Sequence, residues 1–312
     1  MRFLIWFLLA FCLVCCETST TGRTESSYED DTTALRIGVL PTVECLPLYA
    51  AAETGVFDSL GLSVRLVTFE AAMDADTAFF RGHVDGVAAD LVKAVLWKSQ
   101  GDSIRMALSA DLNLHLVTSR PSRLKTGESL KERIVAFTRN SALDYTADGM
   151  LAASKLQSEQ LNKPQINNIQ LRLQMLLNNQ YDGAILPEPY ATLAISQGHN
   201  LVLSTQNLKR YNPLFAIVMH DSLLLSRRDD VVKMVQAYDI VADRIERSDS
   251  ASAMQWISFL PLAEAWPDSV VLMPVVSRVQ KPSEVLVDSV KQWLRRRTLL
   301  KRDVKSADLL MK

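Results

Sequence analysis

The chain has 312 residues, with 34 basic and 35 acidic side chains and a formal net charge of −1 at pH 7. This near balance excludes the strongly basic footprint of nucleic-acid binding, so we expect no nucleic-acid partner. Hydrophobic residues make up 48% of the chain, enough for one large domain or two modest lobes. Phosphate loops, Gly-x-Ser-x-Gly elbows and His-Glu-x-x-His sites are missing from the sequence, which therefore predicts no cofactor and no metal site.

The N-terminus has the layout of a secretory signal peptide, because a basic residue precedes an unbroken apolar run at 3–14, followed by Cys15, Cys16 and a polar stretch. A run of roughly 12 residues spans only about 18 Å as a helix, short of the ~30 Å hydrocarbon layer, so we interpret 1–16 as a signal peptide with a lipobox and expect the apolar run to be removed. Residues 13–16 resemble a bacterial lipobox. Cys16 is the predicted lipid attachment site and Cys15 the competing one; the alternative is an ordinary cleaved signal with incidental cysteines.

Residues 17–33 contain no aliphatic side chain and consist mainly of Ser, Thr, Asp and Glu. Such a segment buries too little apolar surface to fold, and we predict a flexible tether. The fragment from about Thr33 onwards is expected to fold as a soluble monomer. A lipid anchor would hold it at a membrane, in the periplasm or another extracytoplasmic space.

After the tether, short apolar runs alternate with helical patterns. The runs at 35–40, 63–69, 86–88 and 104–110 predict strands, and the amphipathic stretches at 46–54 and 91–99 predict helices. Strands separated by helices imply right-handed crossovers and a largely parallel sheet covered on both faces. The fold class is therefore α/β.

A second α/β unit follows, with a strand near Ile134, a helix at 142–157 and a strand at 183–186. A strand at 213–219 and helices at 229–248, 251–259 and 283–296 are expected to return to the first unit. We therefore predict one lobe from 34–117 and 215–312 and another from 118–214. Ligands of open α/β sheets lie beyond the carboxyl ends of the strands, so this arrangement indicates a cleft between the lobes.

Four stretches carry a family resemblance, which runs from about residue 35 to 292: LRIGVLPTVECLPLYAAAETGVF (35–57), GLSVRLVTF (61–69) followed by FRGHVDGVAAD (80–90), DGAILPEPYA (182–191) and RDDVVKMVQAY (228–238). In order and spacing they resemble the type 2 periplasmic-binding fold, in the group of sulfonate, nitrate and thiamine-pyrimidine binding proteins. The resemblance implies a two-lobed solute-binding protein that closes on a small-molecule ligand and delivers it to the permease and ATPase subunits of an ABC importer.

This resemblance implies binding without chemistry, so we do not expect an enzyme. Two alternatives stay open. One is an enzyme on the same fold, of the pyrimidine-precursor synthase or menaquinone-pathway type. The other is a sensory or scaffold subunit of a membrane complex with a vestigial cleft.

Strand ends single out the candidate ligand-binding residues: Thr42, Glu44 and Cys45 after the first strand, Asp90 after the third, Asp111 after the fourth, and Asn140, Ser141 and Glu188 from the other lobe. Five of these residues also have a structural alternative. Asp90 and either Asn140 or Ser141 are candidate helix N-caps, Glu188 suits a helix N-terminus, and Cys45 fits a buried thiol. Tyr49, Trp97 and Tyr190 either stack on a planar ligand or belong to the core.

The charge of these candidates suggests a ligand class. Glu44, Asp90, Asp111 and Glu188 are acidic, and Arg139 is the one nearby cation in this interpretation. Carboxylates around an anion would add repulsion to desolvation, whereas an amine or aminopyrimidine supplies hydrogen-bond donors. We therefore expect a cationic or donor-rich ligand.

Overall fold

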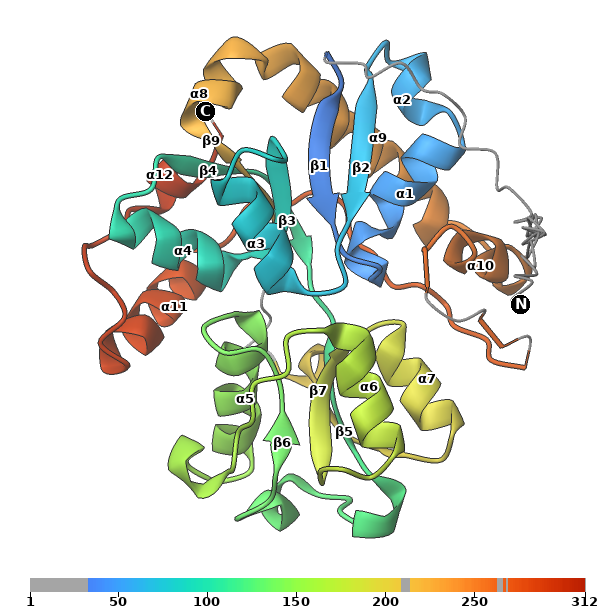
Figure 1. The fold of residues 1–312 in the computed structure, drawn as a ribbon, viewed down its shortest axis with the longest axis vertical. Helices are drawn as coiled ribbons and strands as arrows, with labels where there is room; N and C mark the ends of the chain where they lie inside the picture. The colour runs from blue at the N-terminus through green and yellow to red at the C-terminus, as the bar shows by residue number, and fades with distance from the viewer. Residues whose placement is uncertain (1–32, 209–213, 263–265, 268, 312) are drawn as a thin grey trace, which may run out of the picture. The chain divides into compact units, whose positions relative to one another are not determined.

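The computed structural model describes residues 33–208, 214–262, 266–267 and 269–311 (Figure 1). The predicted signal peptide, almost all of the predicted tether, Cys15 and Cys16 lie outside the described residues. The chain from Ala34 to Lys312 forms one compact unit of strands and helices. Within the described ranges, no helix combines the length and the apolar character needed to cross a membrane.

The first sheet has five strands in the order β2-β1-β3-β9-β4. They are β1 (Leu35–Val39), β2 (Val64–Thr68), β3 (Gly86–Asp90), β4 (Ile104–Asp111) and β9 (Leu214–His220). β1 runs parallel to β2 and β3, whereas β9 is antiparallel to β3 and β4. Strands β3 and β9 are almost wholly buried, as expected for a sheet covered on both faces.

The second sheet has four strands in the order β6-β7-β5-β8. They are β5 (Leu114–Thr118), β6 (Val135–Ala136), β7 (Gly183–Pro187) and β8 (Asn200–Ser204). β5 is antiparallel to β7 and β8, and β6 is parallel to β7. The boundary that the sequence suggested between the lobes, at 117 and 118, falls inside β5. The division into two lobes stays a prediction.

The chain crosses between the sheets twice. The first crossing consists of Leu112 and Asn113, between the end of β4 and the start of β5. The second follows β8 and begins with a short 3-10 turn, Thr205–Asn207. Thr205 links the two crossings, because its Oγ1 accepts a hydrogen bond from Leu114 N at 3.0 Å and donates one to the Leu112 carbonyl at 3.5 Å.

The helices are α1 (Leu46–Glu53), α2 (Val56–Ser59), α3 (Ala72–Phe80), α4 (Leu91–Gln100), α5 (Ala142–Ala153), α6 (Ile169–Leu177), α7 (Tyr190–Ser196), α8 (Asp221–Ser226), α9 (Arg228–Glu246), α10 (Ser250–Ile257), α11 (Glu284–Arg296) and α12 (Ser306–Leu309). α9 packs on α1 and α2, and α11 packs on α4, so the C-terminal helices return to the first sheet as predicted. α6 packs on β7, and α7 packs on β5 and β7.

Helix α9 shows how the sequence builds this packing. Buried Val231, Met234, Tyr238, Val241 and Ile245 recur every three or four residues along it, which places them on one face. The first turn carries two aspartates and the last turn an arginine, charges that suit the helix dipole. The apolar face therefore lies against α1, and the polar face remains exposed.

Helices α5 and α11 meet through a set of polar contacts that we call the α5–α11 contact. Arg297 Nη1, just after α11, lies 2.7 Å from Asp144 Oδ1. Trp293 Nε1 donates to Asp148 Oδ2 at 2.9 Å, and the hydroxyls of Tyr145 and Ser289 are 2.8 Å apart. These bonds join a helix that follows the second sheet's β6 to one that packs beside the first sheet.

Candidate ligand-binding pocket

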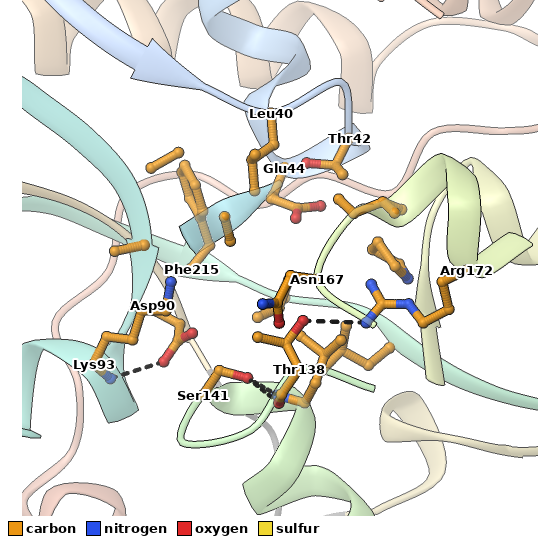
Figure 2. Close-up of a pocket in the computed structure, with 18 residues that line it drawn as sticks. Leu40, Thr42, Glu44, Asp90, Lys93, Thr138, Ser141, Asn167, Arg172 and Phe215 are labelled. Carbon is orange, nitrogen blue, oxygen red and sulfur yellow. Dashed lines mark hydrogen bonds between the residues drawn. The ribbon is translucent and has the colours of Figure 1, made fainter. Parts of the chain in front are cut away.

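A pocket of about 560 Å³, open solvent at its mouth included, lies where elements of the two sheets meet (Figure 2). We call it the binding pocket. Thr42, Glu44, Asp90 and Lys93 line it from the first sheet's connections, and Thr138, Ser141, Asn167 and Arg172 line it from the second's. Leucine side chains and Phe215 complete the walls. Its lining, apolar side chains with a few polar groups, is typical of a site for a small organic molecule.

Glu44 enters the binding pocket from the turn after β1. The turn is fixed to the second sheet, because Val43 N donates to the carbonyl of Glu188 at 2.9 Å. The pKa of Glu44 is raised to about 7, mainly by burial. Local hydrogen bonds oppose this shift, and the negative charge of Glu188 adds to it. Near neutral pH the carboxyl of Glu44 is therefore poised between its charged and neutral forms.

Asp90 is both a wall of the binding pocket and a helix cap. It ends β3, and its Oδ1 accepts a hydrogen bond from Lys93 N at 2.9 Å, so it is the N-cap of α4 as one interpretation of the sequence had it. Burial raises the pKa of Asp90, and the charge of Lys93 opposes that shift. Lys93 Nζ in turn bonds Asp76 Oδ2 at 2.6 Å. One ammonium, that of Lys93, thus lies near both carboxylates and forms its ion pair with Asp76.

Ser141 joins the pocket from the second sheet's side. Its hydroxyl accepts from Leu143 N at 3.2 Å, which makes it the N-cap of α5, and donates to the Thr138 carbonyl at 2.8 Å. Asn140 is exposed, has a φ of 54° and is not among the residues that line the binding pocket. Of the two candidates, Ser141 supplies both the cap and the pocket wall.

Arg172 is a pocket residue that the sequence interpretation missed. It lies in α6 and is 1% exposed, yet its guanidinium faces the binding pocket near Thr138 and Asn167 (Figure 2). Nη1 donates to Thr138 Oγ1 at 3.2 Å, and Nε has no hydrogen-bond partner among the described residues. Burial lowers the pKa of Arg172 to about 10, so the side chain is still charged at neutral pH.

Asp111 and Glu188 lie in a neighbouring hollow, which we call the acidic hollow and which shares Glu44 with the binding pocket. Glu188 Oε1 is 3.4 Å from His115 Nε2, and its carboxylate accepts hydrogen bonds from the backbone and the hydroxyl of Thr192, both at 3.0 Å. Glu188 thus occupies the N-terminus of α7, the structural alternative considered for it. Burial lowers the pKa of His115, and the charge of Glu188 opposes that shift.

The remaining candidates lie away from the binding pocket. Cys45 is fully buried in the core, where burial raises the pKa of its thiol. Tyr49, Trp97 and Tyr190 are buried core residues, and Trp97 stacks on Phe79. None of these four side chains lines the binding pocket, so the core interpretation fits them.

The premise that Arg139 is the one cation near the ligand is wrong. Arg139 is exposed and donates to the carbonyl of Lys163 at 2.9 Å, whereas Lys93 and Arg172 line the binding pocket. Both were missed because they lie three to four residues inside helices, not at strand ends. In the part of the chain that the structure describes, no cluster of three or more His, Cys, Asp or Glu side chains is arranged to hold a metal ion.

A model of the NMT1-like family matches residues 29–258, and no curated protein sequence matches the chain. The ligand binding component of an ABC-type import system from Staphylococcus aureus, solved with zinc bound, is similar in structure, with a TM-score of 0.72 at 14% identity over 89% of this chain and 96% of that one. The alkanesulfonate-binding protein SsuA from Xanthomonas axonopodis pv. citri, bound to MOPS, gives 0.69 at 16% identity over 89% and 98%.

The desulfurization enzyme DSZB is similar too, with a TM-score of 0.63 at 12% identity over 89% of this chain and 96% of that one. At these identities the likeness establishes the fold. The expected α/β fold of periplasmic binding proteins, with two sheets flanked by helices, is confirmed. The expectation of largely parallel sheets is wrong, because β9 and β5 each run antiparallel to both of their neighbours and both sheets are therefore mixed.

Proposed function

Since the chain belongs to the NMT1-like family, we propose that it is the solute-binding protein of an ABC-type importer and captures a small organic molecule in the binding pocket. The observation that carries this proposal is that both sheets contribute polar side chains to one pocket, with Glu44 on one side and Arg172 on the other. A molecule held by both sides stabilises the arrangement of the sheets described above. Permease and ATPase subunits would recognise that liganded arrangement.

The N-terminal sequence supports a place outside the cytoplasm. A short apolar run behind a basic residue, a lipobox-like stretch ending at Cys16 and a polar tether are typical of an exported lipoprotein. We propose that Cys16 carries the lipid and that the folded unit is held at the membrane as a monomer.

The proposal contains no chemical step. One structural neighbour is an enzyme, so a nucleophile in or near the binding pocket would favour catalysis. Cys45, the residue after Glu44, is one candidate nucleophile, but it is fully buried and burial raises the pKa of its thiol. A thiol that resists ionisation in this way is a poor nucleophile.

A binding screen tests the proposal. The full-length protein in mild detergent is heated with vitamins, pyrimidines, amines, sulfonates and amino acids, and its melting temperature is recorded. We expect at least one solute class to raise the melting temperature, because a ligand that binds the folded state stabilises it by mass action. Isothermal calorimetry then gives the stoichiometry, which should be one molecule per chain.

A variant with a filled pocket is the matched control. Ala72 is a half-buried residue at the start of α3 that lines the binding pocket, so Ala72→Trp should occupy the ligand's space while the core stays intact. The variant should fold and lose the solute-dependent stabilisation. If no solute stabilises the wild type, or if the variant responds as the wild type does, the proposal is wrong and a sensory or scaffold role becomes the better interpretation.

A further inference from the structure

Arg172 stands apart from the other buried cations of the described chain. Three cationic side chains are buried there, Lys93, Arg172 and Lys291. Lys93 Nζ lies 2.6 Å from Asp76 and Lys291 Nζ lies 2.9 Å from Asp303. Arg172 is the most enclosed of the three, and no carboxylate of the described chain forms an ion pair with it. Burying a charge without a partner is costly, so a counter-ion from outside the chain is the natural complement.

The surroundings of Arg172 leave room for that counter-ion. Thr138 accepts a hydrogen bond from one guanidinium nitrogen, and the neutral Tyr181 hydroxyl donates to the backbone carbonyl of Arg172. The guanidinium carries five N–H donors in a planar fork. Nε is buried, unpartnered and part of a side chain that lines the binding pocket. This geometry suits a carboxylate, sulfonate or phosphate group, each of which accepts two parallel hydrogen bonds from such a fork.

The position of Arg172 is fixed before any ligand arrives. Asn168 caps α6 through Leu171 N at 2.7 Å, and its Nδ2 donates to Glu70 Oε2 at 2.8 Å. Ile169 N also donates to the carbonyl of Glu70 at 3.1 Å. The first turn of α6 is therefore tied to the loop before α3, and a preorganised donor set of this kind favours anion binding.

Glu44 presents the opposite charge from the other sheet's side. It lines the same pocket, and among the described residues no cationic side chain forms an ion pair with its carboxylate. The second pocket acid, Asp90, already accepts a hydrogen bond from Lys93 N and has the Lys93 ammonium nearby. Among the described residues, the binding pocket thus contains one cation without an ion-pair partner, Arg172 on the side of the second sheet, and Glu44 on the side of the first is an acid that forms no ion pair with a cation.

We propose that the solute is amphoteric: an anionic group of the carboxylate, sulfonate or phosphate class pairs with Arg172, and an amine or another donor of the same molecule pairs with Glu44. The inference rests on the proposed function and names the class of its ligand. It revises the expectation of a cationic or donor-rich ligand, because such a ligand without an anionic group would leave Arg172 buried and unpaired. Leu40, Leu114, Leu143 and Phe215 would contact the apolar middle of the molecule.

The test uses matched probes: 3-aminopropanesulfonate and 4-aminobutanoate carry both charged groups, their isosteres butanesulfonate and pentanoate carry only the anion, and butylamine carries only the cation. Calorimetry on the full-length protein in detergent should show at least one two-charge probe binding about tenfold or more tighter than its single-charge analogues. Arg172→Met should lose that advantage for anion-bearing probes, and Glu44→Gln should lose it for amine-bearing ones. Arg139→Met, the same change at an exposed neighbour, should bind as the wild type does.

A second measurement separates a ligand-binding role of Arg172 from a structural one. Without ligand, Arg172→Met should melt at or above the wild-type temperature, because it removes an unpaired buried charge. A fall of several degrees in that variant, or single-charge probes binding as tightly as the two-charge probes, overturns the inference. If no probe of this series binds, the inference is wrong as well. The proposed function would still stand if a solute of the wider screen binds and Ala72→Trp abolishes its effect.

Discussion

Replacing Asp148 by asparagine should destabilise the protein by about 2–4 kcal/mol. The carboxylate of Asp148 accepts hydrogen bonds from Ser158 Oγ at 2.6 Å, Lys163 Nζ at 2.9 Å and Trp293 Nε1 at 2.9 Å, and Arg297 Nη1 lies 3.5 Å away. A hydrogen bond to a charged group contributes about 1.5–3 kcal/mol. Asparagine keeps one oxygen acceptor but turns an NH₂ group toward donors, so one of these bonds is lost and the others are weakened.

Differential scanning calorimetry of the full-length protein measures this change. For a folded unit of roughly 280 residues, 2–4 kcal/mol corresponds to a melting temperature lowered by roughly 3–7 °C. Asp243→Asn is the matched control, since Asp243 pairs with the largely exposed Arg247 on α9 at 2.9 Å, and such pairs contribute about 0.3–0.5 kcal/mol. If the two variants melt at the same temperature, the α5–α11 contact does not carry the stability assigned to it here.

The effect of Asp148→Asn should also depend on pH. Burial alone would raise the pKa of Asp148, but hydrogen bonds from Ser158 and Lys163 and the charge of Lys163 hold it below the ordinary value of 3.8. A depressed carboxyl pKa adds stability above the unfolded value, and that stability is lost as the pH falls through the folded one. The difference between wild type and variant should therefore be complete at neutral pH and shrink below about pH 4.

Three further predictions concern other parts of the chain. The melting temperature of Glu44→Gln should rise relative to that of the wild type as the pH rises from about 5 to 8, because a buried carboxyl with a pKa raised to about 7 stabilises the folded state only while it is protonated. A difference in melting temperature that is independent of pH would contradict this. Gly86→Ala should lower the unfolding free energy by about 1–3 kcal/mol, since the added Cβ would lie 2.9 Å from Met219 Cε and 3.1 Å from Ile37 Cδ1; an unchanged midpoint in urea would show that β3 and β9 adapt. Cys16→Ser should abolish labelling of the cells' protein by a palmitate analogue, and labelling that persists until Cys15 is also replaced would move the anchor to that residue.

Much of the fold could be predicted because its apolar runs are bounded by clear signals. The strand expected at 35–40 is observed at Leu35–Val39, and the helix expected at 91–99 is Leu91–Gln100, closed by Gly101 in a left-handed conformation. The helix expected at 142–157 ends earlier, at Ala153. Long-range pairing was less accessible: β9 lies between β3 and β4 in the sheet, and only the helices after it indicated its return to the first sheet.

The missed elements are those with weak boundaries. β5 follows β4 after only two residues, too few for a turn signal, so its change of sheet was not apparent. α6 was missed although Asn168 is a good N-cap and Ile169, Leu173 and Leu176 have helical spacing. Missing α6 also meant missing Arg172. No pattern in the sequence says that an arginine is buried, because its usual place is the surface.

Thr205 connects the two crossings between the sheets. Its hydroxyl is bonded to both ends of the first crossing, at Leu112 and Leu114, while its backbone begins the second. Chain segments joined in this way move together, so we expect the two crossings to act as a single hinge if the sheets rotate relative to one another. Leu112 and Leu114 also line the binding pocket, so a substitution at Thr205 should affect both the crossings and the site for the solute.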